Sequence, residues 1–452
     1  MAARRPAKAL PTTLTAVDLA SRIARGEVSA RDSTEAALAR IAERDGEIGA
    51  WALVDGELAR TRADALDAHR GAGRPLGPLH GVPLGIKDII DTADMATESG
   101  TVLDAGRQPR ADAVVVARLR AAGAVILGKT VTTELASYTP GKTRNPHNPA
   151  HTPGGSSSGS AAAVADAMVP AALGTQTNGS VIRPAAFCGV VGFKPTFGLV
   201  ARTGVLSQSP SLDTVGVLTR DLGDAALIAD VIAGHDRADP ATSPSAAPRL
   251  RELAASPPPV TPALAFIRSP AWERAEADTV DAFDELVDEL AGVTAFDLPA
   301  PFADALKWHR TVMLAELGHC YRRYAEHGRD RLSQRLSGMI DEGQAIRASD
   351  YLLARDWQAL LAATLDEVFT QFDAIITPAA PGPAPLGLDT TGDPSFCSIW
   401  QLCGAPAVSL PLLTASNGLP MGVQIVGRRG YDGRLLRTAA WIAARLAPES
   451  AT

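Results

Sequence analysis

The most informative segment of the chain, residues 152–195, reads TPGGSSSGSAAAVADAMVPAALGTQTNGSVIRPAAFCGVVGFKP. Two clusters of glycine and serine, 154–160 and 174–180, lie on either side of a run of small residues. Glycine permits backbone torsions and close approaches that other residues resist. A serine between glycines is sterically open and can face a substrate. Two such clusters at a fixed separation therefore indicate one assembled site.

A second motif lies upstream, in HGVPLGIKDIIDT at residues 80–92. Val82, Leu84 and Ile86 alternate with smaller residues, which predicts a buried strand that ends at Lys87. A lysine in that place is usually a solvated edge residue. The alternative is a lysine held inside the protein, where desolvation lowers its pKa and makes it a base.

Together these motifs resemble the amidase signature family: GIKD around Lys87, GGSSSGSAAAVA at 154–165, GTQTNGS at 174–180 and RPAAFCGVVGFKPT at 183–196. The resemblance runs from about Thr15 to Leu446 and is weak between about residues 236 and 373. It implies an α/β fold: a single α/β/α domain with a large twisted mixed β-sheet flanked by helices. We expect that domain to span residues 13–448, with residues 1–12 disordered.

Composition narrows the class of protein. Of 452 residues, 46% are hydrophobic and 21% charged, as is ordinary for a globular protein. The net charge of −7 argues against a nucleic acid or an anionic membrane as the main partner. Four cysteines in so long a chain do not form a disulfide framework, which favours a reducing cytoplasm. We find neither an export signal nor a run of 18 apolar residues that could span a membrane.

The elements expected in chain order alternate between helix and strand. Thr15 with Asp18 predicts a helix start, and a second helix follows from about Ala30. Residues 81–130 should form strand, helix and strand, with Asp112 capping the helix and the next strand at 124–128. Further helices are expected at 157–166 and 221–234.

The C-terminal half is more helical. Residues 239–262 are rich in Pro, Ala and Ser and predict a loop. Residues 270–372 form a helical variable region within the domain. Strands are expected at 373–378, 405–411 and 421–427, before a last helix at about 432–446. We expect the strands at 405–411 and 421–427 to join the sheet that contains 82–86.

The chemistry suggested by these residues is acyl transfer. Cleavage of an amide needs a nucleophile, a base that becomes an acid, and donors for the oxyanion. Ser180 is the candidate nucleophile, and backbone N–H groups of Thr177, Asn178, Gly179 and Ser180 could form the oxyanion hole. In isolation, GTQTNGS also fits a tight turn with a surface serine.

The family resemblance assigns the remaining catalytic roles. It implies that Ser156, after a cis peptide bond with Gly155, relays the proton to a neutral Lys87. Ser157 and Ser158 are plausible supports for this relay, and helix capping is their alternative role. Asp88 should not pair with Lys87, because neighbouring side chains in a strand point to opposite faces.

Three positions depart from the family pattern. Many members have aspartate where Gln176 stands and glycine where Asn178 stands, and their arginine usually follows the nucleophile by two residues. Here Arg183 follows it by three. Arg183 could therefore bind an acidic group on the substrate, or form a structural ion pair. Asn178 should make the oxyanion loop less permissive.

The sequence gives few indications of the residues that line the substrate pocket. Tyr138 and Thr139 could line the acyl pocket. Residues 395–404, SFCSIWQLCG, predict a helix near the site, in which Phe396, Trp400 and Cys403 face either the pocket or the core.

Other site types are weakly indicated. GSSSG matches the nucleophile elbow of α/β-hydrolases, centred on Ser157, but no strong apolar strand leads into Gly155. The glycine clusters lack the G-K-[ST] of a phosphate loop. His147 and His151 are separated by Pro149, which excludes a helical metal pair. We therefore expect neither a metal nor a cofactor.

These observations predict a cytoplasmic amidase that cleaves a small-molecule amide, without nucleic-acid or membrane partners; a homodimer is compatible with the sequence. One alternative is the glutaminase subunit of a tRNA-dependent amidotransferase, whose members usually carry GTDTGGSIRQPA where this chain has GTQTNGSVIRPA. Another is a binding protein that lost catalysis through the changes at Gln176 and Asn178.

Overall fold

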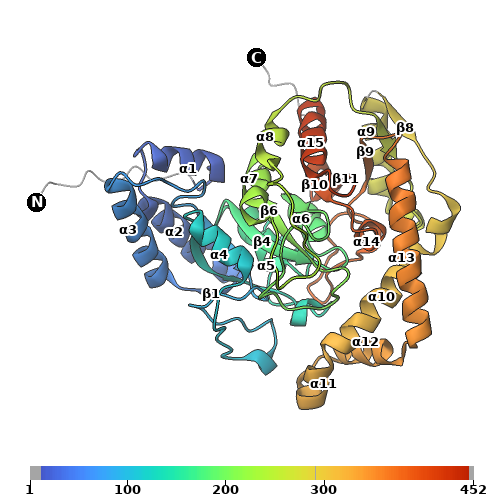
Figure 1. Ribbon diagram of the computed structural model, residues 1–452, viewed down its shortest axis with the longest axis horizontal. Coiled ribbons are helices and arrows are strands. Elements are labelled where there is room, and N and C mark those ends of the chain that lie inside the picture. Colours follow the sequence, from blue (N-terminus) through green and yellow to red (C-terminus); the bar gives the residue numbers. More distant parts are fainter. Residues whose placement is uncertain (1–11, 291, 447–452) are drawn as a thin grey trace, which may run out of the picture.

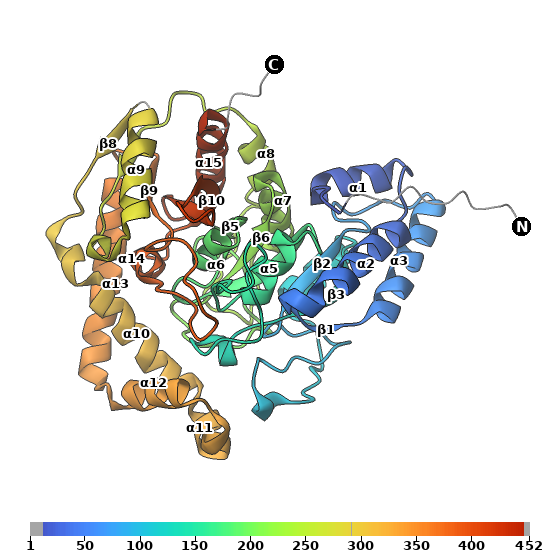
Figure 2. The ribbon, with the colours of Figure 1, turned by 180° about the vertical axis from the view of Figure 1, so that it is seen from behind.

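The computed structural model describes residues 12–290 and 292–446, and within them eleven strands form one mixed sheet (Figures 1 and 2). The strand order is β1-β3-β2-β4-β6-β5-β10-β11-β9-β7-β8. Their bounds are β1 (Trp51–Val54), β2 (Pro83–Lys87), β3 (Val125–Thr130), β4 (Ala171–Gln176), β5 (Val191–Lys194), β6 (Thr214–Thr219), β7 (Leu264–Phe266), β8 (Val293–Ala295), β9 (Ala374–Pro378), β10 (Ala407–Thr414) and β11 (Pro420–Val426). The two C-terminal strands therefore lie in the sheet that contains β2, as expected.

Both faces of the sheet are covered by helices. Successive side chains of β4 show this, since Leu173 packs in one hydrophobic cluster and Ala172 in another on the opposite face. The first face carries α4 (Val114–Ala121), α7 (Leu222–Ile232), α8 (Leu250–Ala255) and α15 (Asp432–Leu446). The second carries α2 (Ala30–Ile48), α3 (Gly56–Gly71), α5 (Ser158–Ala165) and α6 (Ile182–Phe187). This arrangement confirms the predicted α/β/α fold with a mixed sheet.

Small residues allow the second face to pack closely. The helix α5 reads SGSAAAVA, and a Cβ on its Gly159 would lie 2.1 Å from the carbonyl oxygen of Ala50 and 2.4 Å from the backbone nitrogen of Val131. Only glycine fits there. The run of small residues in the sequence thus has a direct packing cause.

Four helices of the C-terminal half form an extension, whose hydrophobic cluster also includes side chains of β7, β9, β10 and β11. The extension contains α10 (Ala305–Cys320), α11 (Arg322–Gly328), α12 (Gln334–Ala345) and α13 (Ala348–Val368), packed around apolar side chains such as Trp308, Leu336 and Leu361. In both views these helices lie on the opposite side of the molecule from α1 (Ala16–Ala24), α2 and α3, with α11 at their tip (Figures 1 and 2). The other helices of the C-terminal half are α9 (Ala277–Glu289) and α14 (Ser395–Leu402).

Local predictions held in part. Thr15 accepts a hydrogen bond from the backbone of Asp18 at the start of α1, as predicted. The predicted cap at Asp112 is wrong, because α4 begins at Val114 and the carboxylate of Asp112 instead binds the backbone of Ala93 and the guanidinium of Arg120.

The predicted loop at 239–262 also needs correction, since it contains the helix α8. The backbone N–H groups of Leu250 and Arg251, at the start of α8, donate to the carboxylate of Asp230 at 2.6 and 2.8 Å. That residue lies on α7, so the cap is remote and local composition could not reveal it. The expected disorder of residues 1–12 lies almost entirely outside the described residues.

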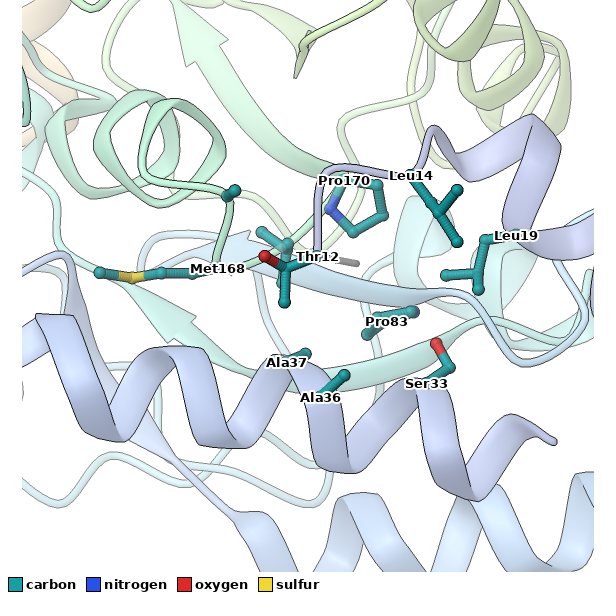
Figure 3. Close-up of a pocket in the computed structure, with 11 residues that line it drawn as sticks. Thr12, Leu14, Leu19, Ser33, Ala36, Ala37, Pro83, Met168 and Pro170 are labelled. Carbon is teal, nitrogen blue, oxygen red and sulfur yellow. The ribbon is translucent and has the colours of Figure 1, made fainter. Parts of the chain in front are cut away.

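Two further points about the fold concern membrane-spanning helices and a cavity near the N-terminal helices. Within residues 12–290 and 292–446, no helix combines the length and apolar character that a bilayer span requires. A small cavity lies between α2 and the start of β2, lined mainly by apolar side chains such as Leu19, Pro83 and Met168 (Figure 3). It has room for about one water molecule.

Candidate active site

The candidate site lies where two parallel strands end. Lys87 is the last residue of β2 and Gln176 the last of β4, and the two strands are neighbours in parallel register. The carboxyl ends of parallel strands meet at one edge of a sheet. The loop after β4 carries Ser180, and Ser156 lies just before α5, which packs on the same strands.

Lys87 is fully buried and bound to two side chains. Its Nζ lies 2.7 Å from Oγ of Ser156, 2.8 Å from Oγ1 of Thr175 and 3.5 Å from the carbonyl oxygen of Thr175. No carboxylate is among its hydrogen-bond partners in the described part of the chain. Burial lowers the pKa of Lys87 well below its ordinary value, and the more distant charge of Asp213 opposes this only in part. The environment therefore favours the neutral amine.

Asp88, which directly follows Lys87 at the end of β2, has a different partner. Asp88 points away from Lys87 and pairs with the buried Lys129, with 3.5 Å between the carboxylate and Nζ. Burial raises the pKa of Asp88 to about 6 and lowers that of Lys129 to about 8. The expectation that Asp88 does not pair with Lys87 is confirmed.

The serines before α5 tie this helix to β4. The peptide bond between Gly155 and Ser156 is cis. The hydroxyl of Ser157 donates to the carbonyl of Thr175 and accepts from its N–H, both at 3.2 Å. It makes no capping bond to α5. Ser157 thus contacts Thr175, the second partner of Lys87, rather than Ser156 itself. Ser158 lies 3.4 Å from the carbonyl oxygen of Val131.

Ser180 lies in the loop between β4 and α6, next to a row of free backbone donors. Throughout the described residues, the N–H groups of Thr177, Asn178, Gly179 and Ser180 have no protein acceptor. Buried N–H groups without partners are rare, and consecutive ones can provide a binding site for negative charge. The hydrogen bonds of Lys87 and Ser156 do not include Ser180.

Gln176 is held by its amide group. Its Oε1 accepts from the N–H groups of Val181 at 2.9 Å and Ile182 at 3.0 Å, at the start of α6. Its Nε2 donates to Oε1 of Gln401 on α14 at 3.1 Å, and Gln401 donates back to the carbonyl of Gln176. A neutral amide thus supports the loop that carries Ser180, at the position where many family members carry a carboxylate.

Asn178 is tied to two neighbours. Its Oδ1 accepts from the hydroxyl of Ser398 on α14 at 2.6 Å, and its Nδ2 donates to the hydroxyl of Tyr138 at 3.0 Å. Asn178 is not among the residues with positive φ, so the chain needs no glycine here. Tyr138 lies beside the loop that carries Asn178, where burial raises the pKa of its phenol.

Arg183 is buried and bound to backbone oxygens. Its guanidinium donates to the carbonyl of Gly155 at 2.7 Å, to that of Gly392 at 3.0 Å and to the hydroxyl of Thr391 at 3.2 Å. Its Nε has no partner among the described residues, and no carboxylate pairs with it there. These contacts form no ion pair; they hold the backbone just before Ser156.

The helix predicted near the site is α14. It contacts the nucleophile loop through Ser398 and Gln401, and a Cβ on Gly179 would lie 3.1 Å from Sγ of Cys397. Trp400 is buried in the hydrophobic cluster of the helical extension, and its Nε1 has no hydrogen-bond partner in the described part of the chain. Phe396 and Cys403 are buried as well.

The sequence analysis did not single out three residues around the nucleophile loop. Thr175 binds Lys87, and it stands inside the quoted motif. The carboxylate of Asp213 accepts from the hydroxyl of Thr177 at 2.6 Å, and Nε2 of His309 lies 3.1 Å from the carbonyl oxygen of Thr177. His309 belongs to a helix without any motif, so no sequence signal marked it.

Metal chemistry has no obvious place in this site. Across residues 12–290 and 292–446, no three or more histidine, cysteine, aspartate or glutamate side chains cluster in a way that could hold a metal ion.

Comparison with known proteins shows the family to which the chain belongs. Residues 32–436 match the Amidase family model. A glutamyl-tRNA(Gln) amidotransferase subunit from Salinispora arenicola is 35% identical, covering 97% of this chain and 98% of that protein. The chain belongs to the amidase signature family and is an enzyme of the class that hydrolyses C–N bonds.

Solved structures agree with this assignment. The native peptide amidase from Stenotrophomonas maltophilia has a TM-score of 0.82 and 30% sequence identity, covering 96% of this chain and 97% of that one. A structure reported as a vestigial protein complex that reveals the origins of an s-triazine catabolic enzyme has a TM-score of 0.90 and 28% identity, covering 96% and 99%.

Proposed function

We propose that this protein hydrolyses a carboxylic amide through an acyl-enzyme on Ser180, with Ser156 and Lys87 as the proton relay. The observation that carries the proposal is the environment of Lys87, a fully buried amine 2.7 Å from the hydroxyl of Ser156, to which no carboxylate of the described residues is bonded. A neutral amine can accept a proton, whereas a charged ammonium cannot.

In this mechanism Ser180 attacks the amide carbonyl, and its proton passes through Ser156 to Lys87. The tetrahedral oxyanion is bound by the N–H groups of Thr177, Asn178, Gly179 and Ser180, which have no acceptor within the described residues. Lys87, now an ammonium, returns the proton through Ser156 to the departing nitrogen. Water then attacks the acyl-enzyme by the same route and releases the acid. The relay needs Ser156 to reach both neighbours in turn.

Ammonia release by the purified protein tests the proposal. Incubation with aliphatic, aromatic and amino-acid amides, without any added partner, should yield ammonia from at least one class. Fluorophosphonate-rhodamine should label Ser180, as located by mass spectrometry, and Ser180→Ala should lose both activities while it keeps its melting temperature. An adduct on another residue would refute the nucleophile assignment. A folded protein that neither turns over amides nor reacts would instead favour the binding-protein alternative.

A second candidate is the glutaminase subunit of a tRNA-dependent amidotransferase, favoured by the 35% identity over 97% of the chain to a protein of that name. Against it stands the local sequence GTQTNGSVIRPA, which differs from the GTDTGGSIRQPA usual in that group. Ammonia release from simple amides by the isolated chain supports the independent amidase. Release from glutamine alone, and only with partner subunits, supports the second candidate.

A further inference from the structure

The helix α10 holds the nucleophile loop from the side of the helical extension. His309 and Glu316 lie seven residues apart, two turns along the helix, and therefore on the same face of α10. His309 is buried, and its Nε2 lies 3.1 Å from the carbonyl oxygen of Thr177. A carbonyl can only accept, so the imidazole is the donor and carries its proton on Nε2.

The bond from His309 fixes a peptide plane that belongs to the oxyanion site. The peptide between Thr177 and Asn178 is trans, and in a trans peptide the C=O and N–H vectors point in opposite directions. When the oxygen of Thr177 is held by His309, the N–H of Asn178 is therefore aimed away from α10. That N–H lacks a protein acceptor within the described residues.

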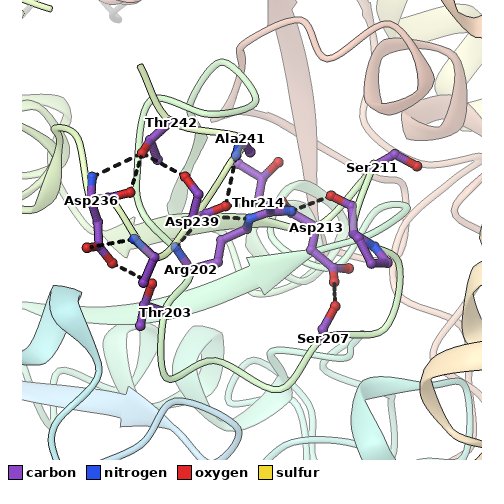
Figure 4. Close-up of polar contacts among 12 residues, drawn as sticks. Arg202, Thr203, Ser207, Ser211, Asp213, Thr214, Asp236, Asp239, Ala241 and Thr242 are labelled. Atoms are coloured by element: carbon purple, nitrogen blue, oxygen red, sulfur yellow. Dashed lines mark hydrogen bonds and ion pairs between the residues drawn. The ribbon is translucent and has the colours of Figure 1, made fainter. Parts of the chain in front are cut away.

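Thr177 is also held through its side chain. The hydroxyl of Thr177 donates to one carboxylate oxygen of Asp213 at 2.6 Å, and the other oxygen accepts the N–H groups of Gln208 and Ser209, each at 2.9 Å. Figure 4 shows the hydroxyl of Ser207 bound to the carboxylate of Asp213. The hydroxyl of Ser209 in turn donates to Glu316. The α10 face thus reaches Thr177 directly at its carbonyl and indirectly at its hydroxyl.

We propose that His309 is a positioning residue for catalysis, which orients the Asn178 N–H toward the oxyanion by holding the carbonyl of Thr177. This inference rests on the proposed function, since it requires that the loop bind an oxyanion on Ser180. A preorganised donor stabilises charge without reorganisation during the reaction, whereas a peptide free to rotate loses that advantage. His309 touches neither substrate nor nucleophile in this role.

The imidazole acts as a neutral donor. Burial lowers the pKa of His309 to about 4, although its bond to the Thr177 carbonyl opposes the shift. The ring therefore stays uncharged throughout the neutral range. We assign the acidic limb of the pH–rate profile to Lys87. Replacing His309 should therefore leave the apparent pKa of that limb unchanged.

Paired substitutions of His309 test the inference. His309→Leu fills a similar volume without a donor, and His309→Gln keeps an amide N–H at the reach of Nε2. We expect His309→Leu to lower kcat for amides by about 10- to 100-fold, with KM changed less than about twofold, because one of several oxyanion donors is misdirected rather than removed. His309→Gln should recover most of that loss. The second-order rate of labelling by fluorophosphonate-rhodamine should follow kcat, since its phosphoryl oxygen enters the same hole.

The matched control is His319→Leu, an exposed histidine on the same helix, which should keep kcat within about twofold. The inference is overturned when His309→Leu keeps the wild-type kcat, or when His309→Gln is impaired as severely as His309→Leu, which would indicate packing alone. Melting temperatures of all variants separate misfolding from lost positioning. Ser180→Ala in the same series distinguishes the failures: if it remains active or labelled, the proposed function itself is wrong.

Discussion

Lys87 is the residue whose protonation should control the rate. Its pKa is lowered by burial, so the catalytic neutral form dominates above the lowered pKa and is lost as pH falls through it. We expect the acylation rate for amides to fall along an acidic limb. Lys87→Ala should reduce acylation of an amide by roughly 10²- to 10⁴-fold, and acylation of its matched ester by less, because an alkoxide needs less help from an acid.

The measurement is the acylation rate against pH for both substrates, in wild type and variant. Lys87→Arg should fail like Lys87→Ala, since a guanidinium stays charged. The exposed Lys142, replaced by alanine, provides the control and should leave the profile unchanged. A Lys87→Ala enzyme with the wild-type amide rate and the same acidic limb would contradict the mechanism.

Arg183 is the second residue with a sharp expectation. Its planar guanidinium donates hydrogen bonds to three oxygens, on Gly155, Thr391 and Gly392, whereas a lysine donates from a single nitrogen. Arg183→Lys should therefore leave buried acceptors unpaired, lower the free energy of unfolding by about 1–3 kcal/mol and reduce kcat. Urea denaturation and steady-state kinetics measure the two effects.

The choice of substrate separates two roles for Arg183. An equal loss for acid-bearing and neutral amides identifies it as a structural clamp. A loss confined to acid-bearing amides assigns it to the substrate carboxylate. Full activity of Arg183→Lys on both would contradict either role.

The residues proposed to form or position the site differ in how far the sequence could reveal them. Sequence motifs contain Lys87, Ser156 and Ser180. Alternating apolar residues predict the buried strand before Lys87, and the glycines predict the two open turns with the serines. His309 and Asp213 act through contacts with Thr177 that span 132 and 36 residues. Such contacts depend on how the helical extension docks on the sheet, and neither residue stands in a local pattern that reports docking.

At the scale of elements, α10 depends on Glu316 for its attachment to the loop before β6. The buried carboxylate accepts from Ser209, from the backbone and hydroxyl of Ser211, and from Tyr351 on α13. Glu316→Gln replaces one acceptor oxygen by a donor that faces hydroxyl groups. We expect the free energy of unfolding in urea to fall by about 2 kcal/mol.

A surface glutamate supplies the comparison for Glu316. Glu342 on α12 pairs with Arg310 in an exposed salt bridge, so Glu342→Gln should change stability by less than about 0.5 kcal/mol. Equal effects of the two substitutions would show that Glu316 does not anchor α10.

Elements were predictable where their pattern is local. The strand ending at Lys87, the small-residue helix α5 and the last helix α15 follow from spacing and composition. The helix α8 could not be predicted in this way, because its cap comes from Asp230 on another helix and its surroundings are rich in proline. The three-residue strands β7 and β8 are too short for alternation to show; pairing with their neighbours defines them.

At the scale of the molecule, the C-terminal strands complete the sheet. The strand β10 pairs with β5 on one side and with β11 on the other, and β11 pairs with β9. Removing residues 405–452 should leave the edges of β5 and β9 unpaired and expose the apolar faces that α15 covers. We expect the truncated chain to be insoluble, and its solubility beside that of the full chain checks this. A soluble, cooperatively folding product would show that the N-terminal part is an independent unit.

The position of β10 also governs the protein during its synthesis. Every residue proposed for the relay has left the ribosome once Ser180 has emerged, yet the strand that pairs with β5 is translated more than 200 residues later. The growing chain must keep that edge from pairing with other nascent chains throughout this interval. Chaperone contact, translation rate near the 3′ end of the message and late nonsense mutations should therefore affect the yield of enzyme more strongly than events near the codons of the motif.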